Sequence, residues 1–248
     1  MKTIDKYRQA LTSLEDWDDY LLSHSGLPGP RANLELLRAV YLEGEEPLFR
    51  RYLREYGQPD QAPVNSPQQF LFLCGVVGLG KLLPSSAVFH TLRQLASDPR
   101  WRTREGVCIA LQYFGDHNIQ YLLSEMQNWS RGSFFEQRAA IVALCEPRLL
   151  SEEHIALQVI TLVNDVTFSL ISAQDRRQED YKVLRQALAY CWSVAIVGLP
   201  IAGKMYMENW LKSGDKDVQW VMRENLKKKR LEKMDPDWVR EVRQKLDH

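Results

Sequence analysis

Apolar residues recur every three or four positions along most of this chain, which is the spacing of an amphipathic helix. The pattern is clearest after Asp98-Pro99, where Asp can accept hydrogen bonds from free N–H groups and Pro suits a first helical turn. Gly115-Asp116 predicts the end of that helix, because glycine readily takes the left-handed conformation of a C-cap. We therefore predict two short helices joined by a turn. Their two apolar stripes contain Val107, Ala110, Leu111 and Phe114, and then Ile119, Leu122, Leu123 and Met126.

Helical spacing also covers the rest of the chain, whereas no alternation of period two is long enough for a sheet. We expect an N-terminal helix within residues 1–25, with its apolar stripe over residues 4–22. Further helices are expected at 33–42, 47–56, 67–83, 85–96, 134–145, 152–172, 181–197, 203–211, 217–233 and 237–246. The sequence therefore predicts an all-α protein.

Two stretches rich in glycine and proline interrupt these helices. Residues 23–30 read SHSGLPGP and predict a turn or hinge. Residues 57–67 contain three prolines and form the strongest break, so a subdomain boundary, if the chain has one, is expected there. The length of 248 residues suits one solenoid of several helix pairs or two small globular domains.

One short motif occurs twice. Trp101, Arg104 and Glu105 form W-x-x-R-E, and the same pattern returns near the C-terminus. Residues three and four apart share one face of a helix, so each copy predicts one indole, one guanidinium and one carboxylate side by side. Recognisable repeats lie about thirty to forty-five residues apart, a period typical of helical solenoids. The second copy is Trp220, Arg223 and Glu224, and a weaker third copy is Phe135, Arg138 and Ile141.

The first copy and the residues after it resemble a known repeat family. Arg104-Glu105, Ala110-Leu111, Gly115-Asp116 and Leu122 are similar to the HEAT-like repeat of helix pairs, including its bacterial lyase-type variant. The resemblance implies an α–α superhelix, which we expect to extend as one domain over residues 1–248. It also implies a non-enzymatic scaffold or adaptor that binds another macromolecule on its curved face, and we favour a protein over a nucleic acid.

The charge balance bears on the partner. Lys plus Arg and Asp plus Glu both number 32, so the formal net charge is zero. This balance argues against a protein whose whole surface binds a polyanion, although it leaves room for one basic face. The strongest basic run is Lys227, Lys228, Lys229, Arg230 and Lys233. We interpret it as a solvated helix face, with contact to phosphates as the alternative.

The cysteines and the apolar stretches indicate a compartment. Four cysteines lie far apart in apolar segments without a C-x-x-C pair, as expected of small buried residues in a reducing environment. The N-terminus lacks the apolar run of a signal peptide. The stretches around 70–83 and 187–202 fall short of the roughly 20 residues of a spanning helix. We therefore expect a cytoplasmic protein without a membrane partner.

Two runs imitate a phosphate-binding loop. Gly75 to Lys81 and Gly198 to Lys204 both fit G-x-x-x-x-G-K. The Ser or Thr that holds Mg²⁺ is replaced by Leu82 in one run and Met205 in the other, and no preceding strand is predicted. We therefore interpret these glycines as positions where helices end or pack closely. The five histidines have no partner at metal-ligand spacing, so neither a cofactor nor a metal is expected.

A second resemblance supplies the alternative function. The alkylpurine DNA glycosylases are built from HEAT-like repeats and place a tryptophan and an acidic residue against a damaged nucleotide, which would assign catalysis to Trp101 and Glu105. The segment 235–238, DPDW, is similar to their terminal helix. This chain has Glu where that family has Asp, and its motif is duplicated. We therefore favour a structural interpretation, in which Trp packs between repeats while Arg104 and Arg223 hydrogen-bond to neighbouring turns.

The residues of the repeated motif and of the basic run form the candidate binding face. If they contact a partner, this face consists of Trp101, Arg104, Glu105, Trp220, Arg223, Glu224, Lys227, Lys228 and Arg230.

Overall fold

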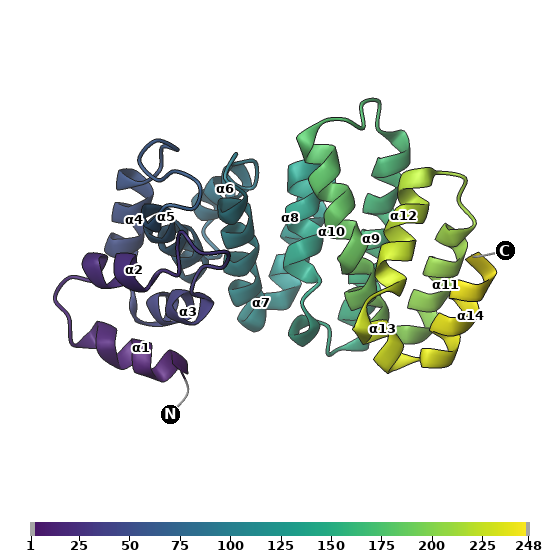
Figure 1. Ribbon diagram of the computed structural model, residues 1–248, viewed down its shortest axis with the longest axis horizontal. Coiled ribbons are helices and arrows are strands. Elements are labelled where there is room, and N and C mark those ends of the chain that lie inside the picture. The colour runs from purple at the N-terminus through teal and green to yellow at the C-terminus, as the bar shows by residue number, and fades with distance from the viewer. Residues whose placement is uncertain (1–2, 247–248) are drawn as a thin grey trace. The chain divides into compact units, whose positions relative to one another are not determined.

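The protein is all-α in the computed structural model, which describes residues 3–246 (Figure 1). This part of the chain contains fourteen α-helices, two short 3-10 helices and no strand. Helices close in the sequence pack against one another, so the predicted all-α class, built from neighbouring helix pairs, is confirmed. The chain divides into two compact units, residues 1–114 (unit 1) and 115–248 (unit 2). The division does not fall at residues 57–67, which lie inside unit 1.

Unit 1 packs its helices around α5. Helix α4 packs along α5, α2 and α3 also contact α5, and α1 covers α3. The core contains Phe49, Tyr52 and Phe70, all fully buried. The elements of this unit are α1 (Thr3–Thr12), α2 (Asp18–His24), α3 (Leu34–Glu43), α4 (Glu46–Glu55), α5 (Pro67–Gly78), η1 (Leu79–Leu82), α6 (Ser86–Leu95) and the first part of α7 (Trp101–Trp129).

The N-terminal segment differs from its prediction, because residues 4–22 form two helices rather than one. The chain leaves the helix after Thr12, and α2 begins at Asp18. The reason lies in tertiary contacts of Asp18, whose carboxylate accepts hydrogen bonds from Arg51 Nη1 at 2.7 Å and Tyr52 Oη at 2.7 Å on α4. A continuous apolar stripe therefore did not guarantee a continuous helix.

The first phosphate-loop-like run has a packing role. A Cβ on Gly78 would lie 2.2 Å from the ring of Phe49, so glycine allows α5 to approach α4 closely. Lys81 Nζ donates to the carbonyl oxygens of Leu42 at 3.3 Å and Gly44 at 2.7 Å, at the end of α3. A cation there satisfies carbonyl groups that have no partner within the helix.

Helix α7 bends at Asn118, whose φ of −142° and ψ of 56° are not helical. Two helical segments meet there, as predicted, but the turn lies beyond Gly115-Asp116. Gly115 is buried, and a Cβ on it would lie 2.7 Å from the side chain of Leu122. Close packing, rather than a left-handed C-cap, therefore explains this glycine.

Unit 2 is organised around α10, which contacts α8, α9, α11, α12 and α13, several of them side by side in Figure 1. The predicted helix over 217–233 is two helices, with a break at Lys227 and Lys228. The elements of this unit, after the end of α7, are α8 (Phe134–Leu144), η2 (Pro147–Leu149), α9 (Glu153–Ser172), α10 (Glu179–Gly198), α11 (Pro200–Leu211), α12 (Lys216–Leu226), α13 (Lys229–Met234) and α14 (Pro236–Leu246).

Helix α9 is long and apolar enough to cross a membrane by length and composition, and it is the one such helix within residues 3–246. Half of its apolar window is buried inside the protein. The helix packs on α8, α10, α11 and α12, which is the environment of a core helix in unit 2. The four cysteines are free and buried, as expected.

A buried asparagine joins α12 to α10. Asn225 is fully buried, and its Oδ1 accepts from the backbone N–H of Ser193 at 2.8 Å. Its Nδ2 donates to the carbonyl oxygens of Leu188 at 2.9 Å and Val221 at 2.8 Å. Every polar atom of the side chain is therefore bonded inside the helix packing.

Replacing Asn225 with Ala should lower the free energy of unfolding by about 1–3 kcal/mol, because the backbone N–H of Ser193 and the carbonyl of Leu188 would lose a buried partner. Urea-induced unfolding measures the change. Asn209→Ala is the control, since Asn209 is exposed on α11 in the same unit. Equal stabilities of the two variants would contradict this role.

Asp217 forms a second polar junction, between α12, α10 and the loop that precedes α10. Its carboxylate accepts hydrogen bonds from Tyr181 Oη at 2.6 Å, from Arg176 Nη1 at 3.2 Å and from Arg185. Burial by itself would raise the pKa of Asp217, but the bonds from Tyr181 and Arg185 outweigh it and hold this pKa below its usual value.

Stability should therefore depend on the ionised form of Asp217. Because its folded pKa is lowered, the group stabilises the fold above the unfolded value of about 3.9, and this contribution is lost as the pH falls through the folded pKa. Melting temperatures between pH 7 and pH 2.5 should fall less steeply for Asp217→Asn than for the wild type. Asp165→Asn, an exposed change on α9 with the same loss of charge, should follow the wild type. Parallel curves for all three proteins would contradict this assignment.

Candidate functional site

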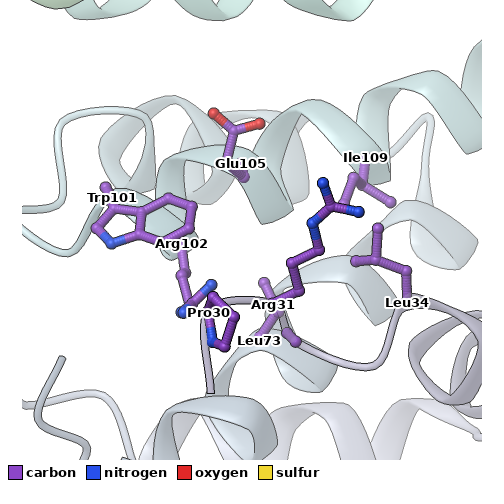
Figure 2. A pocket seen from close by; sticks show the side chains of 9 residues that line it. Pro30, Arg31, Leu34, Leu73, Trp101, Arg102, Glu105 and Ile109 are labelled. Carbon is purple, nitrogen blue, oxygen red and sulfur yellow. The ribbon is translucent and has the colours of Figure 1, made fainter. Parts of the chain in front are cut away.

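Unit 1 contains an open pocket of about 320 Å³ with mainly apolar walls (Figure 2). One wall comes from α7 and the facing wall from the loop before α3 and the first residue of that helix, as Figure 2 shows. Leu73 of α5 also contributes to the lining. The lining residues are Pro30, Arg31, Ala32, Leu34, Leu73, Trp101, Arg102, Glu105 and Ile109.

Helix periodicity places the α7 residues on the pocket. Trp101, Glu105 and Ile109 are each four residues apart, so they lie along one face of the helix. The indole of Trp101 is 44% exposed, whereas Glu105 and Ile109 are half-buried. The pocket therefore offers an accessible aromatic ring and one carboxylate on the same wall.

The opposite wall is held by local hydrogen bonds. Gly26 has a φ of 76°, and Asn33 accepts from the backbone N–H of Leu36 at 3.0 Å as the N-cap of α3. Asn33 Nδ2 also donates to Tyr7 Oη at 2.9 Å and to the carbonyl of His24 at 3.0 Å. One side chain thus connects α1, the end of α2 and the start of α3, which positions Arg31 and Leu34.

The start of α7 is fixed by Arg100, which is only 2% exposed. Its guanidinium pairs with the carboxylate of Asp98: Nε donates to Oδ1 at 2.9 Å, and Nη2 donates to Oδ2 at 2.7 Å. It also donates to the carbonyl oxygens of Tyr56 at 3.2 Å and Gly57 at 2.8 Å, beyond α4. Its guanidinium carbon lies 4.1 Å from the ring centre of Phe72. Arg100 therefore ties the end of α4 and the core to the first turn of α7.

Arg102 is also buried, at 5% exposure, and it lines the pocket. Nη2 donates to Asn65 Oδ1 at 2.9 Å and to the carbonyl of Gly29 at 3.3 Å. The guanidinium lies 4.2 Å from the ring centre of Trp101. Burial lowers the pKa of Arg102. Neither Arg100 nor Arg102 was predicted from the sequence as a site residue, because arginine is usually exposed and neither residue belongs to the repeated motif.

Arg104 has the structural role that was predicted. It is 6% exposed, and its Nη1 donates to the carbonyl oxygens of Asp98 at 2.8 Å and Pro99 at 3.3 Å. These groups belong to the turn before α7. Arg104 does not line the pocket, so of the first motif copy only Trp101 and Glu105 meet there.

The second copy of the motif is arranged differently, in α12 of unit 2. Trp220 is half-buried, and the guanidinium of Arg185 lies 4.5 Å from the centre of its ring. Glu224 accepts a hydrogen bond from Lys227 Nζ at 2.5 Å. Arg223 is exposed and makes no hydrogen bond within residues 3–246, so the prediction for it is wrong. The difference lies in the surroundings: Arg104 reaches back to two carbonyl groups of the turn that precedes α7, whereas the side chain of Arg223 faces solvent.

The basic run lies at the junction of α12 and α13. Lys227, Lys229 and Arg230 are exposed, and Lys228 is half-buried at the break. All four residues belong to unit 2, whereas the pocket belongs to unit 1. Trp238, in the segment 235–238, is largely buried and donates from Nε1 to Glu208 at 2.8 Å.

The charged residues of the second phosphate-loop-like run are also used internally. Lys204 Nζ pairs with Asp235 and lies 5.4 Å from the ring centre of Trp238. A Cβ on Gly203 would lie 2.7 Å from Ile196 Cα, so this glycine allows α11 to pack on α10. Within residues 3–246, no three His, Cys, Asp or Glu side chains are placed to hold a metal ion.

Unit 2 has its own open groove, of about 620 Å³, lined by polar and apolar residues of α9, of the end of α7 and of the turn that follows α7. Its carboxylate is Asp165 and its cation is Arg131, and Leu157 adds an exposed apolar side chain. It contains no residue of the repeated motif.

The part of the chain that the structure describes is thus all-α, and its unit 1 pocket joins an aromatic ring to charged groups. No family model matches the sequence, and no curated protein is significantly similar to it. Among solved structures, one engineered protein shares 15% identity at a TM-score of 0.36, over 94% of this chain and 98% of its own. A second engineered protein has the same identity and TM-score, over 90% of this chain and 57% of its own.

The two motif arginines form a matched pair for a stability test. Arg104→Ala should lower the free energy of unfolding by about 1.5–3 kcal/mol, since it removes buried charge-assisted hydrogen bonds. Arg223→Ala should change it by less than about 0.5 kcal/mol, as is usual for exposed positions. Chemical denaturation of both variants measures the difference. A larger loss for Arg223→Ala would contradict the assignment.

Proposed function

We propose that this protein is a non-enzymatic binding module whose unit 1 pocket receives a segment of a partner protein. The observation that carries the proposal is the pocket itself, an apolar cavity of about 320 Å³ with the accessible indole of Trp101 on one wall. Apolar pockets with a few convergent polar groups are the usual form of a binding site. Tryptophan and arginine are the residues that most often dominate binding energy at protein interfaces.

The exposed apolar residues support a protein partner. Leu34 is 55% exposed and Trp101 is 44% exposed, and both line the pocket. Such side chains placed together favour burial against an apolar surface. The titratable lining residues, Arg31, Arg102 and Glu105, carry both signs, whereas nucleic-acid sites are strongly basic. A peptide with an apolar side chain and a polar backbone suits these walls.

The lining also favours binding over catalysis. Glu105 is its one carboxylate, and no Ser, Thr, Cys, His or Lys is among the nine lining residues. Nucleophilic catalysis needs an activated nucleophile next to a base, and hydrolytic acid–base chemistry commonly uses two titratable groups with different roles.

Peptide selection on the full chain tests the proposal. Peptides selected from a random displayed library should bind the wild type and lose affinity at least about thirtyfold on Trp101→Ala, as expected when a central interface tryptophan is truncated. Trp220→Ala is the control, because Trp220 lies on α12 in unit 2. Fluorescence polarisation with labelled peptides measures the affinities. If no peptide depends on Trp101, the proposal fails.

One observation favours the alternative function, base excision from alkylated DNA. Trp101 and Glu105 line the same pocket, so a ring and a carboxylate could face one extruded base. A carboxylate stabilises positive charge that develops on the sugar, which would be the role of Glu105. The mixed charge of the lining makes us rank this function second.

The alternative has a direct assay. The protein is incubated with methylated duplex DNA, and free 7-methylguanine and 3-methyladenine are measured. We expect no release of either base, and DNA binding that is at most weak and falls steeply with salt. Release that Glu105→Gln abolishes, in a variant with unchanged melting temperature, would establish the glycosylase instead.

A further inference from the structure

A buried and incompletely hydrogen-bonded arginine borders this pocket. Arg102 is 95% buried, yet only one of its three guanidinium nitrogens, Nη2, makes hydrogen bonds. Nε is buried without a hydrogen-bond partner, and no carboxylate of residues 3–246 forms an ion pair with this guanidinium. Neutral oxygens of Gly29 and Asn65 are its acceptors. A buried charge without a counter-charge is costly, so this position favours binding of an anion.

A second cation lies on the facing wall. Arg31 is exposed, and its side chain forms no hydrogen bond or ion pair within the described residues. Figure 2 shows its guanidinium extending from the loop toward α7. Arg31, Arg102 and Glu105 together leave one net positive charge on the lining, and the remaining lining residues are apolar. The pocket thus combines apolar walls with one uncompensated positive charge.

We propose that the pocket recognises an acidic side chain next to an apolar one in a partner protein, with the carboxylate bound by Arg31 and Arg102 and the apolar side chain packed on Trp101 and Leu34. The inference rests on the proposed function and adds the chemistry of the partner. Guanidinium groups bind planar carboxylates through paired, charge-assisted hydrogen bonds, which are stronger and more directional than bonds between neutral groups.

A carboxylate fits better than the phosphates of a nucleic acid. A phosphate backbone presents closely spaced negative charges and is bound by several cations, whereas this lining has a single net positive charge. The carboxylate of Glu105 on the same lining would repel additional anions. A single acidic residue therefore matches the charge of the site.

The test uses peptides selected on the wild-type chain, each synthesised with its acidic residue and with the corresponding amide. We expect the selected sequences to contain Asp or Glu within two residues of an apolar residue. Replacing that acid with Asn or Gln should weaken binding to the wild type about tenfold, and Arg31→Gln should reduce affinity for the acidic peptide to a similar extent. The difference in affinity between the acid and amide forms should then be smaller for Arg31→Gln than for the wild type.

Two further variants sharpen the test. Arg102→Lys keeps the charge but loses the planar guanidinium, and it should also weaken binding of the acidic form. Arg54→Gln is the control, because Arg54 lies on α4 with its side chain 71% exposed and does not line the pocket. It should leave all affinities unchanged. Because Arg31 is exposed, its replacement tests the inference even if Arg102→Lys does not fold.

The outcomes separate this inference from the function on which it rests. Peptides that require Trp101 but carry no acid, or that bind equally well as amides, would overturn the inference and leave the binding function standing. A library that gives no Trp101-dependent peptide would overturn the binding function itself. Displacement of the acidic peptides by an oligothymidylate, lost in Arg31→Gln, would assign the site to phosphate instead.

Discussion

The pocket of unit 1 depends on the ion pair between Asp98 and Arg100. Both side chains are largely buried, and the guanidinium also binds two carbonyl oxygens beyond α4, so neither charge is left without partners. Removing one partner of such a buried pair leaves the other charge uncompensated and is strongly destabilising. Because Asp98 also provides a carbonyl oxygen for Arg104, the pair holds the whole turn from which α7 starts. That turn sets the direction in which Trp101 and Glu105 point.

Three arginines at alternate positions have two different roles here. Arg100 and Arg104 have their bonding capacity used by the turn and by α4, so they contribute to stability. Arg102 lies between them in the sequence but on the pocket side, with neutral acceptors and an unbonded Nε. Incomplete satisfaction of a buried group in an otherwise well-bonded region is typical of a functional position. The proposed carboxylate of a partner would supply the missing counter-charge.

Unit 2 uses polar junctions of another kind. Asn225 and Asp217 each connect α12 to α10, the first through backbone groups in the core and the second through side chains near the surface. Buried polar groups that are fully bonded favour one arrangement of neighbouring helices over alternatives. The repeated tryptophan motif lies beside these junctions in unit 2 and beside a pocket in unit 1. An identical spacing therefore does not imply an identical role.

Most helices could be predicted from the sequence, because apolar periodicity is a local property and each amphipathic face must be buried somewhere. The spacing of Trp101, Arg104 and Glu105 likewise predicted one shared helix face, of which Trp101 and Glu105 line the pocket. Tertiary structure decided the helix breaks at residues 13–17, at Asn118 and at 227–228, where the sequence has no glycine or proline to signal them. It also decided which arginines are buried and that residues 30–34 face α7. These features depend on contacts between segments far apart in the chain, such as Arg102 with Asn65 and Asp18 with Arg51, which no local pattern records.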